Sequence, residues 1–192
     1  MVTQLPVSSA AWSARLLFEL DDIDRSVDEL TSRLTAEQLN WRAAPGTWSI
    51  GQCLEHLCLF SEIYLPAISA ALVEKSASAV EELKFGWFAR WFTRNFVDPS
   101  PSGKRASAPN KIVPGLRVEL AVIDRLRRRN QEARELIRKA GQYDVNRIRF
   151  RNPFMPLVRF TVGTGLYIIC GHERRHLLQA QHVKQAAAFP CS

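Results

Sequence analysis

The sequence lacks the features of a secreted, disulfide-bonded or membrane-spanning protein. Its four cysteines include no C-x-x-C pair and are too few for a disulfide scaffold. No apolar run approaches the roughly 18 residues that a spanning helix needs, and MVTQLPVSSA at the N-terminus has neither the basic stretch nor the apolar block of a signal peptide. We therefore expect a cytoplasmic protein whose cysteines are reduced and packed as small apolar side chains.

The chain also lacks a long run of charge of one sign. It has 26 basic and 19 acidic residues in 192, and the excess is concentrated in two short runs, RLRRR at 125–129 and RIRFR at 147–151. The first run lies in a helical pattern that also contains acidic residues, which indicates a solvated helix face. No nucleic-acid motif accompanies the charge, so we expect no nucleic-acid partner. With 46% hydrophobic and 23% charged residues, the composition is typical of one globular domain covering residues 1–192.

Helical periodicity dominates the first half of the chain. Apolar residues step by three and four from Leu16 to Leu34, which predicts a helix with one buried stripe. Thr35 and Gln38 form a capping-box pattern for a short helical turn, and Ser49 and Gln52 form a second one that opens a helix reaching to about residue 74.

The second half of the chain continues the helical pattern. It predicts a helix at about 115–140, with Leu116 and Leu120 on its apolar stripe, and a last helix from about 161 or 164 to 187. We find no internal repeat and no convincing strand. Four long helices with a long crossover between the second and third predict an all-α fold, a four-helix bundle.

The crossover, at about 75–114, combines two kinds of sequence. PSPSGKRASAP is typical of a flexible loop, whereas Phe85 to Phe96 contains six aromatic residues in twelve. We expect the aromatic segment to cover the open end of the bundle. A contact between two copies of the chain is the second choice, and a helix lying on a membrane surface is the least favoured.

Three of the four histidines fall on inward-facing stripes. His172 and His176 in HERRH are about 40° apart on a helical wheel and one turn apart along the axis, so their imidazoles can converge on one metal ion. His56 on the second helix is the best third donor, whereas His182 points about 120° away from His176. Gln179 shares the ligand face, where it could orient a nucleophile or a ligand imidazole, and a structural role bonded to backbone is equally compatible. We expect Glu173 to face solvent or a salt bridge.

HERRH also matches the H-E-x-x-H signature of zinc proteases, with His182 at the position of a third metzincin ligand. A metzincin needs glycine at position 179 to end the helix, and the chain has glutamine there inside a run of good helix formers. No methionine follows for a Met-turn, no glutamate follows Glu173, and no sheet is predicted beside the helix. The pattern therefore indicates a helical metal site and not a protease.

Two motifs give a resemblance to a known family. WSIGQCLEHL at 48–57 resembles the W-S-x-x-x-x-x-x-H-L segment of the DinB-like superfamily, and HERRHLLQ at 172–179 resembles its H-x-x-x-H-x-x-Q segment. The resemblance implies a helical bundle around one divalent ion, zinc or nickel, with His56, His172 and His176 as ligands. It also implies a homodimer. Characterised members include thiol-dependent transferases and isomerases, and others are classed as metal-dependent hydrolases.

Three functions remain open at this point. The first is a thiol-dependent transferase acting on small electrophiles, because a basic rim including Arg151, Arg159, Lys104 and Arg105 suits an anionic low-molecular-weight thiol. The second is a metal-dependent hydrolase of a small ester or amide, since an ion with an open position also activates water. The third is a non-catalytic bundle that binds a metal or a small molecule.

Overall fold

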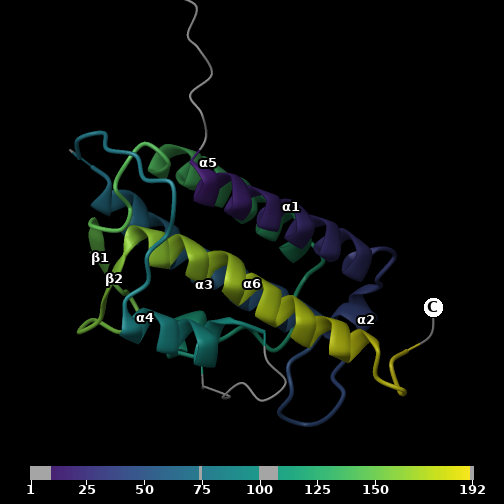
Figure 1. The fold of residues 1–192 in the computed structure, drawn as a ribbon. Coiled ribbons are helices and arrows are strands. Elements are labelled where there is room, and N and C mark those ends of the chain that lie inside the picture. The colour runs from purple at the N-terminus through teal and green to yellow at the C-terminus, as the bar shows by residue number, and fades with distance from the viewer. Residues whose placement is uncertain (1–9, 74, 100–107, 191–192) are drawn as a thin grey trace, which may run out of the picture.

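The computed structural model describes residues 10–73, 75–99 and 108–190. Four long helices make up about half of these residues (Figure 1). They are α1 (Ala11–Thr31), α3 (Ile50–Ala71), α5 (Val122–Ala140) and α6 (Val162–Lys184). Shorter elements are α2 (Ala36–Asn40), α4 (Trp87–Phe92), the π-helix η1 (Thr93–Val97) and the 3-10 helix η2 (Asn110–Ile112). The predicted all-α class is confirmed.

The long helices share one hydrophobic core. Helices α1 and α3 each pack against both α5 and α6, and α3 makes its most extensive contacts with α6. The apolar stripe predicted from Leu16 to Leu34 is buried along its length, although α1 itself ends at Thr31. Since α3 and α6 lie side by side, residues 50–71 and 162–184 can contribute side chains to one site.

Capping boxes fix the starts of α2 and α3, as the sequence predicts. In α2, the hydroxyl of Thr35 accepts from the backbone N–H of Gln38 (3.2 Å), and the Gln38 side chain accepts from the N–H of Thr35 (3.0 Å). In α3, Ser49 and Gln52 make the same pair of bonds, each 3.2 Å long. An N-cap contributes about 1 kcal/mol to helix stability and sets the first residue of the helix.

Helix α5 begins later than the sequence pattern predicts. It starts at Val122, not near residue 115, and Leu116 and Leu120 are exposed (84% and 42%) instead of forming a buried stripe. Asn40 accounts for the difference: its amide donates to the carbonyl of Val118 and its side-chain oxygen accepts from the N–H of the same residue, both at 2.8 Å. Because these bonds occupy backbone groups that a helix would use, residues 113–118 stay non-helical and lie beside α2 and α3.

The expectation that the chain has no strand is wrong. Strands β1 (Arg149–Arg151) and β2 (Arg159–Thr161) pair antiparallel, with Phe150 opposite Phe160. Both phenylalanines are buried, while Arg149, Arg151 and Arg159 beside them are exposed. Three alternating residues in each strand are too few to stand out against the helical pattern of the neighbouring sequence.

The aromatic crossover packs against the hairpin and α6. The ring centroid of Phe160 lies 6.0 Å from that of Phe88 and 5.2 Å from that of Phe92, and the ring of Phe85 contacts Tyr167 of α6. Of the six aromatic residues from 85 to 96, only Trp87 is more than half exposed (81%). This packing favours the covering role over the membrane-surface role. The loop residues 100–107 lie outside the described part of the chain.

No helix in the described residues combines the length and the apolar character needed to cross a bilayer.

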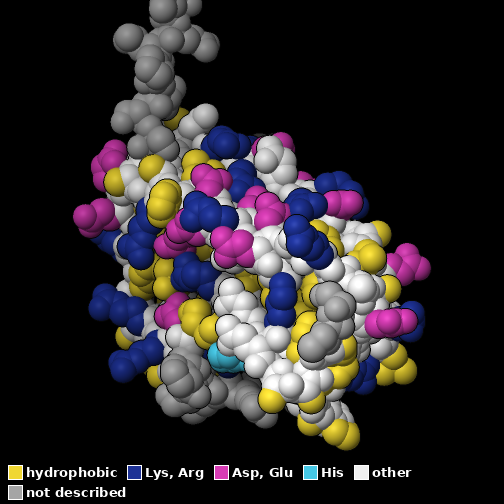
Figure 2. Space-filling view, turned by 90° about the vertical axis from the view of Figure 1, so that its right-hand side faces the viewer, with side chains coloured by type: hydrophobic (Ala, Val, Ile, Leu, Met, Phe, Trp, Pro, Cys, Tyr) yellow, Lys and Arg dark blue, Asp and Glu magenta, His cyan; other side chains and the backbone are white. Residues whose placement is uncertain are grey.

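Several basic residues of α5 pair with acidic neighbours. Arg127 contacts Asp28 at 2.6 Å and Asp124 at 2.8 Å, and Arg129 contacts Glu132 at 2.9 Å. On the face shown in Figure 2, basic and acidic side chains are interspersed. These contacts agree with the prediction that 125–129 forms a solvated helix face, where exposed pairs contribute little to stability.

Replacing Gly165 with alanine should destabilise the protein, because α6 approaches the hairpin without room for a side chain. A Cβ at this position would lie 2.6 Å from Cε1 of Phe150 and 2.9 Å from Cδ1 of Ile68. Overpacking of this kind costs about 1–3 kcal/mol. Thermal and urea unfolding of Gly165→Ala would measure it. The control is Gly86→Ala, where a Cβ meets no atom within 4 Å, and equal loss in both variants would contradict the packing argument.

Candidate metal centre

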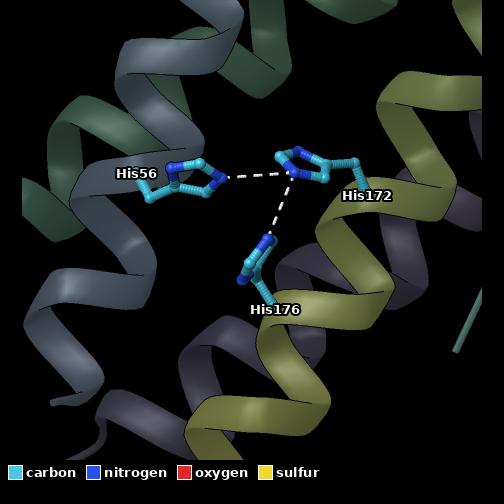
Figure 3. Close-up of side chains that lie close together, drawn as sticks. All are labelled: His56, His172 and His176. Carbon is cyan, nitrogen blue, oxygen red and sulfur yellow. Dashed lines mark hydrogen bonds between the residues drawn. The ribbon is translucent and has the colours of Figure 1, made fainter. Parts of the chain in front are cut away.

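Three histidines converge between α3 and α6. His56 projects from α3, and His172 and His176 project from successive turns of α6 (Figure 3). The Nε2 atom of His172 lies 3.3 Å from Nε2 of His56 and 3.1 Å from Nε2 of His176. One ring nitrogen from each histidine lies within 4.8 Å of the others.

Local sequence explains this convergence. Thr161 caps α6 by accepting from the N–H of Thr164 at 3.2 Å, and the helix then runs without a break through both histidines. A spacing of four residues places two side chains on the same face, one turn apart. His56 comes two turns after the N-cap Ser49, on the side of α3 that packs against α6.

The second ring nitrogens of two histidines are held by acceptors. Nδ1 of His56 lies 2.7 Å from the carbonyl oxygen of Ile112, and Nδ1 of His176 lies 3.1 Å from Oε1 of Gln179. Because a carbonyl oxygen can only accept, each Nδ1 carries the proton and each Nε2 keeps its lone pair. Nδ1 of His172 is buried and has no hydrogen-bond partner among the described residues.

Burial keeps the imidazoles neutral. It lowers the pKa of His56, although the hydrogen bond to Ile112 acts in the opposite direction. Burial, followed by the charges of the neighbouring histidines and of Arg175, places the pKa of His172 well below its usual range. For His176, burial and the proximity of His56 lower the pKa to about 3. At neutral pH the centre therefore presents three uncharged nitrogen donors.

Aromatic rings enclose the centre on two sides. The Trp48 ring stacks on His176 with centroids 5.7 Å apart, and its centroid lies 4.8 Å from that of His56. On the other side, Phe60 lies 4.3 Å from His172. His56 is buried, whereas His172 and His176 are only partly buried.

The donor set fits a divalent transition-metal ion. Two imidazole nitrogens bound to zinc at about 2.0–2.1 Å with a tetrahedral angle between them lie about 3.3–3.4 Å apart. The Nε2 separations of 3.3 and 3.1 Å are close to this value. Neutral imidazoles are typical ligands of zinc and nickel, and the bonds made by Nδ1 of His56 and His176 leave Nε2 free to coordinate.

Comparison with known families agrees with this geometry. The family model described as the DinB superfamily matches residues 19–180. The chain belongs to the DinB superfamily. The matched region includes all three converging histidines and Gln179, and it ends before His182. No curated protein matches the chain in sequence.

In this DinB superfamily protein, neither His182 nor any cysteine among the described residues belongs to the histidine cluster. His182 is exposed and lies outside the histidine cluster, as its helical angle predicts. Cys53, Cys58 and Cys170 are buried and unpaired with one another, and burial raises the pKa of the Cys53 thiol to about 12. Neutral buried thiols of this kind agree with the prediction that the cysteines act as small apolar side chains. Cys191, Lys104 and Arg105 lie outside the described residues.

The expectation that Glu173 faces solvent or a salt bridge is wrong. Its side chain is only 1% exposed, and among the described residues neither carboxylate oxygen has a hydrogen-bond partner. Burial raises the pKa of Glu173 to about 8; the charge of Asp24 raises it further, and the nearby Asn130 and Arg134 lower it. The 100° angle from His172 turns Glu173 away from the histidines, as expected. That side of α6 faces α1 and α5 and not water, so the carboxyl group is buried.

Sequence reasoning did not find two parts of the site. The Ile112 carbonyl is a backbone group in the crossover, and no side-chain pattern marks it. Trp48 belongs to the W-S motif, yet the sequence does not show that its ring stacks on a histidine of another helix. Both depend on tertiary packing between segments more than 50 residues apart.

Proposed function

We propose that this DinB superfamily protein is a metal-dependent enzyme, most specifically a thiol-dependent transferase acting on small electrophiles. The observation that carries the proposal is the convergence of three neutral imidazoles, from His56, His172 and His176, two of which are only partly buried. In this proposal the long helices form the four-helix bundle typical of the family. Zinc or nickel as the ion, a homodimer and a cytoplasmic location belong to the same proposal.

A donor set of three suits catalysis better than a structural role. Among the described residues, no cysteine, carboxylate or further histidine joins the cluster. Structural zinc sites have four protein ligands, whereas catalytic sites have three and leave a position for water or substrate. When bound, a divalent ion at such a site lowers the pKa of a water or thiol that it binds, which supplies a nucleophile at neutral pH.

In this proposal Gln179 orients a metal ligand and contacts the substrate. Its Oε1 accepts from Nδ1 of His176, and this bond orients the imidazole. The amide nitrogen of the same side chain is a donor on the ligand face of α6, where it can hold a substrate oxygen or the thiol's own polar groups. Gln179 thus acts on the reaction through one ligand and through one direct contact with substrate.

The preference for a thiol over water comes from charge. Arg151 and Arg159 pair across the hairpin and are both exposed, and the hairpin turn carries Phe154, whose ring stacks on Phe60 beside His172. Low-molecular-weight thiols carry carboxylates that such a basic rim attracts. Hydrolysis of a small ester or amide needs no such rim, and it is the alternative that the same donor set supports.

Cobalt substitution tests the proposal. Protein purified without a histidine tag and loaded with Co²⁺ should develop a new sulfur-to-metal absorption band when glutathione is added. It should also convert an electrophilic aryl halide faster with the thiol than without it. A response to azide or acetate but not to glutathione would support hydrolysis. A spectrum unchanged by any of these ligands would indicate a closed site, and a non-catalytic metal-binding bundle would replace both enzyme functions.

A further inference from the structure

Residues 110–118, here called the strap, lie along α2 and α3 and carry the carbonyl that holds His56. The strap contains the short helix η2 followed by irregular backbone. Side chains of α2, of α3 and of the loop between them bind its backbone. Asn40 binds Val118 twice, and Arg42 donates to the carbonyl of Leu116 at 2.9 Å.

One residue of the strap, Gly115, is bound by α3 through both its N–H and its carbonyl. The backbone N–H of Gly115 donates to Oε2 of Glu55 at 2.7 Å, and its carbonyl accepts from Nε2 of Gln52 at 2.8 Å. Gln52 has a second function, because its Oε1 also closes the capping box with Ser49. The bond from Gly115 to the carboxylate is charge-assisted, a class about twice as strong as a bond between neutral groups.

These contacts join the strap to the histidine. Gln52, Glu55 and His56 lie within a little more than one turn of α3, and their three bonds reach Gly115 and Ile112, which are three residues apart. Holding Gly115 therefore fixes the distance between α3 and the strap at Ile112. That distance decides whether the Ile112 carbonyl can accept from Nδ1 of His56 and so keep Nε2 unprotonated.

We propose that Glu55 and Gln52 are positioning residues for His56, acting through the strap. They set the tautomer and the orientation of the His56 imidazole, although neither side chain contacts its metal-binding atom Nε2. The inference rests on the proposed function only where it concerns metal affinity. The fixing of the tautomer is a property of the metal-free protein and can be tested separately.

The ion pair of Glu55 with Arg125 does not explain its placement. Arg125 lies 3.6 Å from Glu55 and 3.8 Å from Glu62, and neither contact is a hydrogen bond. Partly exposed pairs of this kind contribute about 0–1 kcal/mol. Glu62 stands seven residues after Glu55 on the same helix and shares Arg125, but it has no hydrogen bond to the strap. Glu62→Gln is thus a matched control for loss of charge on α3.

Metal affinity is the first measurement. By competition with a chromogenic chelator, Glu55→Ala and Gln52→Glu should each bind Zn²⁺ about 10-fold more weakly than the wild type, the lower end of the loss seen when a residue supporting a metal ligand is removed. Glu55→Gln keeps an acceptor for Gly115 and should lose less affinity than Glu55→Ala, because a weaker, uncharged bond is retained. Glu62→Gln should bind like the wild type.

The imidazole proton of His56 is the second measurement, made by NMR on metal-free protein. The wild type should show a slowly exchanging Nδ1–H, and this signal should broaden or vanish in Glu55→Ala and Gln52→Glu but not in Glu62→Gln. Wild-type protein that binds no Zn²⁺ would end the proposed function and leave this readout intact. Persistence of the signal in both strap variants would overturn the inference, and so would an equal loss in Glu62→Gln. Gln52→Glu retains the capping-box acceptor, so it serves if Glu55→Ala fails to fold.

Discussion

Replacing His56 or His176 with alanine is expected to abolish high-affinity binding of a divalent metal ion, whereas His182→Ala leaves binding intact. The Nε2 atoms of the first two lie 3.3 and 3.1 Å from Nε2 of His172, but His182 is exposed and outside the cluster. Loss of a residue that merely supports a ligand weakens binding about 10- to 100-fold, so loss of a ligand itself should exceed about 100-fold. Titration with Zn²⁺ against a competing chelator measures the difference.

His182→Ala is the matched control, because it removes the same side chain from the same helix. Helical circular dichroism of each variant would separate loss of the site from loss of the fold. Equal weakening in His182→Ala and His176→Ala would contradict the three-histidine centre and would bring back the zinc-protease pattern in which position 182 is the third ligand. Unchanged binding in His56→Ala would place the ion elsewhere.

The histidine cluster could be predicted because helical geometry is regular. Four residues of spacing place His172 and His176 on one face, and an amphipathic stripe places His56 on the inward side of its own helix. The capping boxes at Thr35 and Ser49 were predictable for a similar reason, since all their bonds lie within four residues. Local rules decide these features, and tertiary structure leaves them unchanged.

The start of α5 could not be predicted in the same way. The leucines at 116 and 120 continue the helical period of the residues that follow, so the pattern gives no sign of a break. The break comes from Asn40, which binds the backbone of Val118 from 78 residues away. Because the N–H and carbonyl of Val118 are bonded to the Asn40 side chain, they are not available for helical hydrogen bonds. The segment beside His56 is therefore non-helical even though its leucines follow the helical period.

Glu173 shows that a helical wheel cannot predict whether a residue is buried. Its angle correctly turns it away from His172, but an angle on one helix does not say what covers that face. In the structure α1 and α5 pack over it, and Asn130 is buried nearby with its Oδ1 unpartnered. A charged residue type in the sequence favours exposure, and only the packing of the other helices reveals a buried carboxyl group.

Glu173→Gln is expected to make the metal-free protein less sensitive to alkaline pH. Burial raises the pKa of Glu173 from 4.5 to about 8, so between these values the folded state holds a proton that the unfolded state releases. The folded state then binds more protons than the unfolded state, and stability must fall as pH rises from 4.5 through 8. A shift of this size corresponds to a loss on the order of a few kcal/mol when the change is complete.

The amide of glutamine has nearly the shape of the neutral acid and does not ionise, so the variant lacks this loss. Urea unfolding of the two proteins should therefore give similar free energies near pH 5 and a variant more stable by a few kcal/mol at pH 9. The histidines also change stability with pH, because their lowered pKa values favour the folded state at higher pH, but they are common to both proteins and cancel in the difference. Glu119→Gln, a change at an exposed glutamate, should show no such divergence. A constant difference between wild type and Glu173→Gln from pH 5 to 9 would mean that Glu173 does not release its proton in this range, and the neutral buried carboxyl would have to be abandoned.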